Sequence, residues 1–330
     1  ELNFFNDILA FNKIYNIIKT EQPDIIHTHT AKAGTLGRLA GIMYNLLNPF
    51  GNRRIRLVHT FHGHIFEGYF SKLRTRIFLL IERFLALFTS KIITVSESVK
   101  NELMALHVAA GNKIEVIPLG LEIDKLLEIA ISDNAVLNVG IVGRLVPIKN
   151  HRLFLEAAAK TIADNPGTQL RFKIIGDGEL RKDLEEYSHK LNINKQVDFL
   201  GWQKDLVSVY STLDIVTLTS INEGTPVSLI EAMASGKTVV ATDVGGVRDL
   251  LGAEVNSGIK EEANFRVLER GIIVKPGDSI SFAAALTFVL QNYASRNNME
   301  EEARNFVKNR FIKDRLIKDI ENLYDCILPV

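Results

Sequence analysis

The sequence predicts an α/β protein built from two doubly wound, Rossmann-like domains. Short β-branched runs alternate with longer amphipathic segments, which is typical of parallel sheets covered by helices. The alternation stops once, at the polar residues 132–134, and then begins again. At 330 residues the chain is long for one hydrophobic core and suits two domains. Since ligands of such sheets bind at the carboxyl ends of the strands, we expect a cleft between the domains.

Each predicted domain has its own series of strands. In the first, residues 1–120, strands are expected at 24–29, 56–61, 91–96 and 113–119, between helices at about 5–20, 34–47, 71–89 and 97–107. Residues 121–135 are interpreted as a linker. The second domain, residues 136–311, is expected to have strands at 136–143, 170–176, 197–201, 215–220, 238–242 and 271–276. Residues 312–330 are expected to form a C-terminal helix that packs back on the first domain.

Composition excludes several classes of protein. Lys and Arg together number 39, equal to Asp and Glu, so nothing indicates a general nucleic-acid binder. The single cysteine, Cys326, excludes an internal disulfide framework and fits a reducing compartment such as the cytoplasm. No signal peptide or membrane span is recognisable, because the best apolar run, 77–88, is interrupted by Glu82 and Arg83. The chain opens at Glu1 within a helical pattern, so we expect a fragment of a longer protein.

Two glutamates stand eight positions apart in the segment 222–236, NEGTPVSLIEAMASG. Between them, Thr225-Pro226 predicts a helix start with threonine as the N-cap and proline at the first helical position. Glu223 is then expected before the helix and Glu231 within it, among apolar neighbours. Helix N-termini favour anions, and carboxylates bind hydroxyl pairs. The segment predicts a site for a diphosphate between two sugars, a nucleotide-sugar, although the spacing alone also fits two solvated carboxylates.

Glycines and basic residues follow the strands of the second predicted domain. Gly143, Gly176 and Gly201 each end a strand, where glycine allows the backbone to approach a ligand closely. Arg144 and Lys149 lie in the loop after the first of these strands. Because cleavage of a sugar–phosphate bond builds negative charge on the diphosphate, fixed cations at this place would stabilise the leaving group.

Four segments carry a resemblance to a known family: GRLVPIKN (143–150), IIGDGELRKDLE (174–185), LGWQKD (200–205) and NEGTPVSLIEAMASGKTVVATDVGG (222–246). In this order they resemble the retaining glycosyltransferases of the GT-B fold that carry the Glu-x7-Glu motif, the group 1 and family 4 enzymes. The resemblance covers nearly the whole chain. The family's opening strand and Gly-rich loop have no counterpart, so we expect an N-terminally truncated chain with an incomplete first domain.

The resemblance implies a role for each matching residue. Glu223 would bind the hydroxyls of the donor sugar, and Glu231 would hold the ribose hydroxyls. Arg144 and Lys149 would clamp the diphosphate, and His62 would reach the donor sugar near the reacting centre. The remaining donor-binding positions would be Gly143, Gly176, the helix start Gly224, Thr225, Pro226 and Val227, and the strand end Leu200, Gly201 and Trp202 beside the base.

The resemblance also implies a reaction. A sugar would pass from a nucleoside-diphosphate sugar, with UDP favoured, to a saccharide or lipid-linked saccharide in cell-surface polysaccharide synthesis. The configuration at the anomeric carbon would be retained, and no metal or other cofactor would be needed. The segment 252–268 is longer and more polar than a typical connection in this family, and we assign it no function.

Other functions are weighed beside this one. His27, His29, His59, His62 and His64 cluster near two strand ends, so a metal-dependent hydrolase is one alternative. A GT-B nucleotide-sugar epimerase would share the donor site, and a truncated chain could bind the donor without turnover. A Rossmann oxidoreductase is disfavoured because the glycine pair at 176–178 lacks the third glycine of a dinucleotide fingerprint.

The helical segment 69–91 combines apolar residues with an excess of basic residues. Such a surface can lie on anionic lipid, while a core helix with solvated cations is the simpler interpretation. Because many enzymes of the resembling family extend lipid-linked saccharides, we expect a cytoplasmic protein that contacts the cytoplasmic face of the membrane peripherally.

Overall fold

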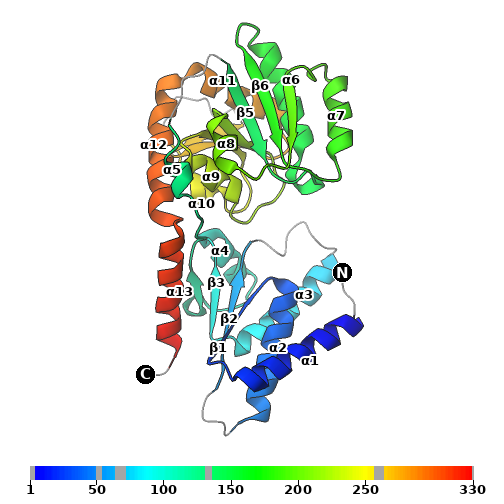
Figure 1. The fold of residues 1–330 in the computed structure, drawn as a ribbon, viewed down its shortest axis with the longest axis vertical. Helices are drawn as coiled ribbons and strands as arrows, with labels where there is room; N and C mark the ends of the chain where they lie inside the picture. Colours follow the sequence, from blue (N-terminus) through cyan, green and yellow to red (C-terminus); the bar gives the residue numbers. More distant parts are fainter. Residues whose placement is uncertain (1–3, 50–53, 64–71, 131–135, 256–263, 329–330) are drawn as a thin grey trace. The chain divides into compact units, whose positions relative to one another are not determined.

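The chain consists of two compact units in the computed structural model, which describes residues 4–49, 54–63, 72–130, 136–255 and 264–328 (Figure 1). Residues 1–119 and 314–330 form the first unit, and residues 120–313 form the second. The last helix of the chain thus belongs mostly to the first unit. Each unit has a sheet with its own hydrophobic core, so the two predicted Rossmann-like domains are confirmed as the fold class.

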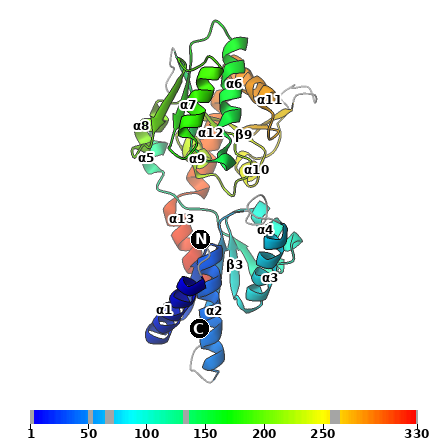
Figure 2. The same ribbon diagram turned by 90° about the vertical axis from the view of Figure 1, so that its right-hand side faces the viewer.

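The first unit contains a four-stranded parallel sheet in the order β1-β2-β3-β4. Its strands are β1 (Ile25–His29), β2 (Arg56–Phe61), β3 (Lys91–Thr94) and β4 (Ile114–Val116). Its helices are α1 (Phe4–Glu21), α2 (Ala31–Leu47), α3 (Lys72–Phe88), α4 (Glu97–Ala105) and α13 (Lys313–Ile327), with a short 3-10 turn η1 (Gly111–Lys113) before β4. Figure 2 shows α1 and α2 side by side.

Alternation along β1 and β2 assigns residues to the two faces of this sheet. Leu57 packs with the buried residues of α1, α2 and α3, whereas Val58 packs with Leu323 of α13. On the first face, α2 comes so close that a Cβ on Gly34 would lie 2.3 Å from the ring of His59. The helix can therefore approach the sheet only because glycine stands at this position.

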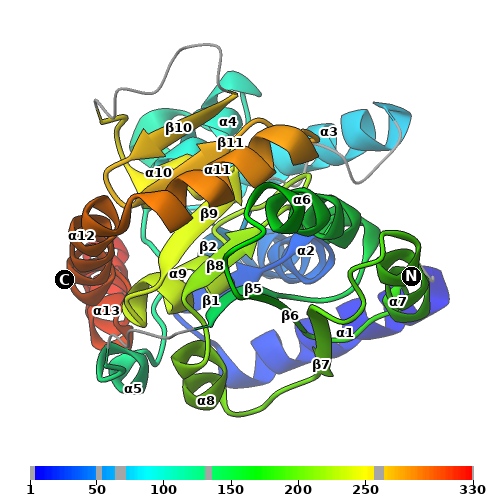
Figure 3. The ribbon, with the colours of Figure 1, turned by 90° about the horizontal axis from the view of Figure 1, so that it is seen from above.

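The second unit contains a seven-stranded sheet in the order β10-β11-β9-β8-β5-β6-β7. Its strands are β5 (Leu137–Val142), β6 (Leu170–Ile175), β7 (Val197–Gly201), β8 (Ile215–Leu218), β9 (Thr238–Thr242), β10 (Phe265–Leu268) and β11 (Gly271–Val274). All neighbours are parallel except β10 and β11. The chain adds β6 and β7 on one side of β5 and returns to place β8 on the other (Figure 3). The strand order therefore reverses between β5 and β8, where open α/β sheets bind their ligands.

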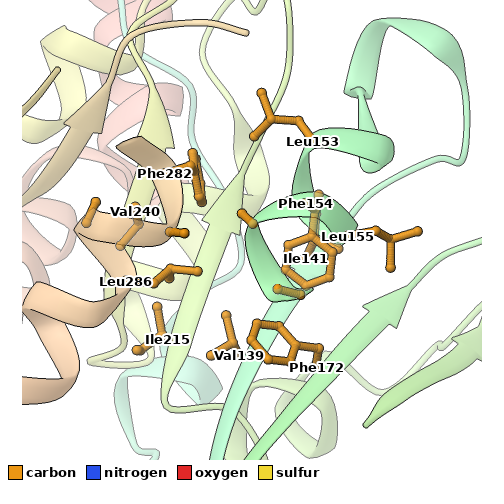
Figure 4. Close-up of a cluster of buried hydrophobic side chains, with 14 of the residues drawn as sticks. Val139, Ile141, Leu153, Phe154, Leu155, Phe172, Ile215, Val240, Phe282 and Leu286 are labelled. Atoms are coloured by element: carbon orange, nitrogen blue, oxygen red, sulfur yellow. The ribbon is translucent and has the colours of Figure 1, made fainter. Parts of the chain in front are cut away.

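Helices cover both faces of the second sheet. They are α5 (Asp124–Leu127), α6 (His151–Asp164), α7 (Arg181–Lys190), α8 (Leu206–Ser211), α9 (Val227–Ala234), α10 (Val247–Leu251), α11 (Ser279–Gln291) and α12 (Tyr293–Arg310). Phe154 of α6 and Phe282 of α11 pack with Ile141 and Phe172 of the sheet in a continuous apolar core (Figure 4). Residues on α9 and α12 pack together elsewhere in the unit.

Several boundaries differ from the sequence expectation. The strand expected at 113–119 ends at Val116, before Pro118, which has no N–H for a sheet ladder. The stretch 121–135, interpreted as a linker, contains α5, and Leu121 pairs with Ile312 in an isolated bridge. Part of 252–268 forms the antiparallel edge strand β10, which was not predicted, while 256–263 lie outside the described residues.

Candidate functional site

The loop after β5 carries the two predicted cations. Gly143 donates a backbone hydrogen bond to Ile175, and the short 3-10 turn η2 (Pro147–Lys149) follows. The Lys149 side chain passes over Gly143, because a Cβ on that glycine would meet its Cε at 3.9 Å. Asn150 then takes a left-handed backbone conformation, φ 49°, which asparagine tolerates, and α6 begins. The turn thus directs Lys149 to the carboxyl end of the sheet.

Hydrogen bonds connect the loop after β8 to this first loop. The Thr219 hydroxyl donates to the carbonyls of Lys149 and Asn150, at 3.0 and 3.1 Å. The Ile221 amide donates to Ile148 at 2.8 Å. From the neighbouring strand β9, the Thr242 hydroxyl donates to the Ser220 carbonyl at 2.7 Å. Satisfied buried hydrogen bonds of this kind rigidify a site.

These hydrogen bonds hold the two loops so that Glu223 contacts Lys149. The Lys149 ammonium donates to Glu223 Oε1 at 2.5 Å, and the Ser220 hydroxyl donates to the same oxygen at 2.6 Å. The Glu223 side chain is only 11% exposed and that of Lys149 24%. Lys149 and Ser220 both contact Oε1, so the second carboxylate oxygen, Oε2, can accept a hydrogen bond from a ligand hydroxyl.

Glu231 lies on α9, where Tyr210 of α8 donates a hydrogen bond to its Oε2 at 2.8 Å. The Tyr210 hydroxyl also contacts the Ser228 carbonyl at 3.2 Å. Burial raises the pKa of Glu231, and the tyrosine hydrogen bond acts in the opposite direction by favouring the charged form. The carboxylate is thus held in a fixed, partly desolvated position.

The predicted start of this helix was wrong by one residue. Pro226, with φ −73° and ψ 111°, is the N-cap rather than the first helical residue, and α9 begins at Val227. Thr225 therefore does not cap the helix, and its buried hydroxyl has no hydrogen-bond partner among the described residues. The Gly246 amide donates to the Gly224 carbonyl at 2.9 Å, which holds the preceding loop in place. Among the described residues no side chain caps α9, so its first N–H groups face outward from the helix end.

The glycines of the neighbouring strand ends have a packing role. Gly176 has φ +135°, and a Cβ there would lie 2.0 Å from the Gly143 carbonyl oxygen. Its amide donates to the carbonyl of Gly201, which has φ +68°. Glycine is therefore required for the loops after β5, β6 and β7 to cross at this distance. Contact of these glycines with a donor stays a prediction.

Other predicted positions lie near these loops without joining the Lys149–Glu223 pair. Arg144 is exposed and has no ion pair within the described part of the chain. Leu200 is partly exposed, and Trp202 is exposed over 72% of its surface. A large exposed aromatic ring is available to stack on a planar ligand group.

Histidines of the first unit form a separate cluster. The ring nitrogens of His29 and His62 lie 2.9 Å apart at the exposed carboxyl ends of β1 and β2. His27 is half-buried on the same face as His29, whereas His59 lies buried on the other face beside Thr28. His64 falls outside the described residues. In the described ranges, no group of three or more His, Cys, Asp or Glu side chains is arranged to hold a metal ion.

Sequence reasoning missed Ser220, Tyr210 and Thr219. Ser220 could have been found, because it lies three residues before Glu223 in the same loop. Tyr210 is 21 residues from Glu231 on another helix, and Thr219 is 70 residues from Lys149. No local spacing connects such pairs.

Comparison with known proteins places these features in a family. The model of glycosyl transferases group 1 matches residues 132–306, more than half of the chain, and that of Glycosyltransferase Family 4 matches residues 2–125. An Escherichia coli UDP-Gal:alpha-D-GlcNAc-diphosphoundecaprenol alpha-1,3-galactosyltransferase is 29% identical over 98% of this chain and 80% of its own length. The Staphylococcus aureus capsular polysaccharide biosynthesis glycosyltransferase CapM is 25% identical over 99% of this chain and 83% of its own.

A solved structure has the same fold. The crystal structure of Anabaena HepE in complex with UDP superposes with a TM-score of 0.77 at 21% identity, covering 96% of this chain and 82% of HepE. The predicted resemblance is thereby confirmed at the level of family and fold. The chain therefore belongs to the glycosyl transferases of group 1, and it is a glycosyltransferase with the two Rossmann-like domains of the GT-B fold.

Proposed function

We propose that this glycosyltransferase moves a sugar from a nucleoside-diphosphate sugar, with UDP favoured, to a saccharide or lipid-linked saccharide acceptor in polysaccharide synthesis. The observation that carries the proposal is the placement of Glu223, Lys149 and Glu231 around the point where the strand order of the second sheet reverses. Lys149 and Glu223 are in contact there, and the uncapped helix that follows the same loop carries the second carboxylate, Glu231. This set matches a diphosphate flanked by two hydroxyl-bearing sugars.

The similar proteins support the choice of donor and acceptor. The E. coli relative is named for transfer from UDP-Gal to a GlcNAc-diphosphoundecaprenol, which is a lipid-linked saccharide. CapM is named for capsular polysaccharide biosynthesis. Structures of HepE were solved with UDP and with UDP-glucose.

Retention of configuration is part of the proposal. Arg144 and Lys149 would neutralise the diphosphate as the bond between the anomeric carbon and the phosphate oxygen breaks. The acceptor oxygen forms the new bond to the same face of that carbon, and its proton passes to the departing phosphate oxygen. Glu223 would hold the donor sugar's hydroxyls, Glu231 the ribose, and His62 of the first unit would contact the donor sugar near the reacting centre. Leu200, Gly201 and Trp202 would lie beside the base.

Calorimetric titration with UDP, GDP, ADP and their sugars tests donor choice in the full chain. We expect one UDP-sugar to bind more tightly than the other nucleotides. Incubation of that sugar with a panel of lipid-linked saccharides, followed by NMR of the product, tests transfer and stereochemistry. An inverted anomeric configuration would contradict the retaining mechanism. Conversion of the donor to an isomer without any acceptor would instead indicate an epimerase.

We propose that the transfer requires no bound metal. EDTA at millimolar concentration is then expected to leave the rate unchanged, whereas a metal-dependent hydrolase using the histidines would lose activity. Restoration of hydrolytic activity by zinc after such a loss would indicate the hydrolase.

Peripheral membrane contact is a further part of the proposal. No helix of the described residues is long and apolar enough to cross a bilayer. On α3, however, Ile77, Leu80, Phe84 and Leu87 are all exposed, and their spacing places them on one face of the helix. The exposed Arg76 lies on the same helix, whose only acidic residue, Glu82, is buried in an ion pair with Arg38. An apolar, basic face of this kind suits an anionic bilayer surface.

Flotation with vesicles tests this contact. We expect the chain to float with phosphatidylglycerol vesicles and less with phosphatidylcholine vesicles. Replacing Leu80 and Phe84 together by serine should release it, whereas replacing the exposed Leu46 and Leu47 of α2 should not. Absence of the wild-type chain from the floated fraction would contradict membrane contact.

A further inference from the structure

Three histidines and a tyrosine form a connected chain on one face of the first sheet. The Tyr324 hydroxyl of α13 lies 2.7 Å from His27 Nδ1, and the Thr60 hydroxyl lies 2.7 Å from His27 Nε2. The rings of His27 and His29 are stacked with their centroids 4.4 Å apart. His29 Nδ1 is then 2.9 Å from His62 Nε2. The chain runs from the C-terminal helix to the exposed end of β2.

The strand register explains why these side chains meet. His27 pairs with Val58 and His29 with Thr60 in the parallel ladder of β1 and β2. Side chains two residues apart share a face, and this face is the one that α13 covers with Leu323. Tyr324 follows Leu323 on the helix and reaches the sheet beside it. His59, one residue from Thr60, faces the other way and takes no part.

Each contact restricts a different degree of freedom. His27 has hydrogen bonds at both ring nitrogens, so its ring cannot rotate without losing one of them. Burial lowers the pKa of His27 to about 4, which keeps the ring neutral, with one donor and one acceptor nitrogen. His29 is limited by stacking on this fixed ring. The His29–His62 hydrogen bond needs one donor and one acceptor, so it couples the tautomers of the two rings.

The backbone after His29 is also constrained. Thr30 has φ 64° and ψ 160°, a strained region that residues other than glycine rarely adopt. Such conformations persist where the surrounding structure determines them. Here the strained residue directly follows the histidine that contacts His62.

We propose that Tyr324 is a positioning residue that fixes the orientation and tautomer of His62 through His27 and His29. The inference rests on the proposed function in one respect, because the proposed function assigns His62 its role at the donor sugar. Tyr324, His27 and His29 need not touch the substrate. A residue at the end of the chain would thereby tune the reaction through the first sheet.

Ring-nitrogen NMR of the full chain labelled with 15N-histidine tests the positioning directly. In the wild type we expect His62 to show one protonated and one unprotonated nitrogen, as a single tautomer does. In Tyr324→Phe, which keeps the aromatic ring and the packing of α13, both His62 signals should move toward intermediate shifts. Thr60→Val removes the other anchor of His27 and should act in the same direction. Tyr15→Phe is the matched control, since it removes a hydroxyl from the same unit outside this cluster.

Kinetics with the donor and acceptor provide a second readout. A displaced imidazole should lower kcat about tenfold in Tyr324→Phe with KM for the donor unchanged within about twofold, because small misplacements at a reacting centre act mainly on the rate. Unchanged His62 signals in both Tyr324→Phe and Thr60→Val would overturn the inference. Full activity of His62→Ala would overturn the proposed role of His62 at the sugar, while the NMR result would still decide the positioning. The two failures are therefore distinguishable.

Discussion

Lys149 and Glu223 form an ion pair of 2.5 Å across the two loops that meet where the strand order of the second sheet reverses. In the proposed complex, Lys149 would bind the phosphates of the donor and Glu223 would bind its sugar hydroxyls. Before the donor binds, each neutralises the other in a partly desolvated position. The pair thus keeps both side chains aimed at the carboxyl ends of the strands, and a donor phosphate would replace part of the interaction of Lys149 with Glu223.

Glu223→Gln is expected to lower the rate of sugar transfer by about 10²-fold or more, because it removes a charged acceptor from the reacting sugar. Ser220→Ala is the matched control, since it removes a neutral donor from the same oxygen and leaves the ion pair. We expect its rate to stay within about tenfold of the wild type. The measurement is release of nucleoside diphosphate at saturating donor. Wild-type turnover in Glu223→Gln would refute the assignment.

Glu231→Gln should weaken donor binding rather than slow the chemical step. If Glu231 holds the ribose hydroxyls, loss of its charge should raise the Kd for UDP by about tenfold, which is the size of one charged hydrogen bond. Tyr210→Phe should weaken binding less, because the carboxylate remains while its support is lost. Calorimetry with UDP measures both. Glu186→Gln, on the exposed face of α7, serves as a control and should bind UDP as the wild type does.

The sequence predicted the parts of this site that depend on local pattern. The strand ends at Gly143, Gly176 and Gly201 lie where the alternation of strands and helices indicated. The Lys149–Glu223 pair joins residues 74 positions apart, and it depends on the order of strands in the sheet, which hydrophobic periodicity does not encode. Local pattern also failed at Thr225-Pro226, where the proline takes an extended ψ and the helix begins one residue later.

The edge strand β10 was missed for a related reason. Phe265–Leu268 is only four residues long and lies after the polar segment, so its pattern resembles a loop. Its pairing with β11 is antiparallel, whereas alternating strands and helices predict parallel neighbours. In the first unit, the histidines were recognised as a group, but their partner Tyr324 is 297 residues from His27. Long-range contacts of this kind arise from packing of α13 on the sheet.

Gly176→Ala should destabilise the second unit strongly. Its Cβ would lie 2.0 Å from the carbonyl oxygen of Gly143, and φ +135° disfavours any side chain. Backbone atoms cannot yield as a flexible side chain would, so we expect a loss of about 3 kcal/mol or more in the free energy of unfolding. Gly167→Ala is the matched control, because a Cβ there meets no atom within 4 Å. Chemical denaturation compares the two variants. Equal stability would show that the loops can separate without cost.

The buried His59 should make the stability of the first unit depend on pH. Burial lowers the pKa of His59 from 6.5 to about 2, with the nearby Arg38 adding to the shift. As pH falls below 6.5, the unfolded chain binds a proton at this position and the folded chain does not, so folding becomes less favourable. Between pH 6.5 and about pH 4.5 this single group should remove about 2 kcal/mol of stability.

The contribution of His59 can be separated from that of other groups by comparison with His59→Asn. Asparagine can keep the hydrogen bond with Thr28 that His59 Nδ1 makes, but it does not titrate. Burial raises the pKa of Glu82, which gives a pH dependence of the opposite sign. That dependence is common to both proteins and cancels in their difference. Urea denaturation followed by circular dichroism at several pH values should give a shallower loss of stability for the variant. Equal losses of stability with falling pH in the two proteins would contradict this prediction. They would mean that His59 is already protonated in the folded state or remains neutral in the unfolded one.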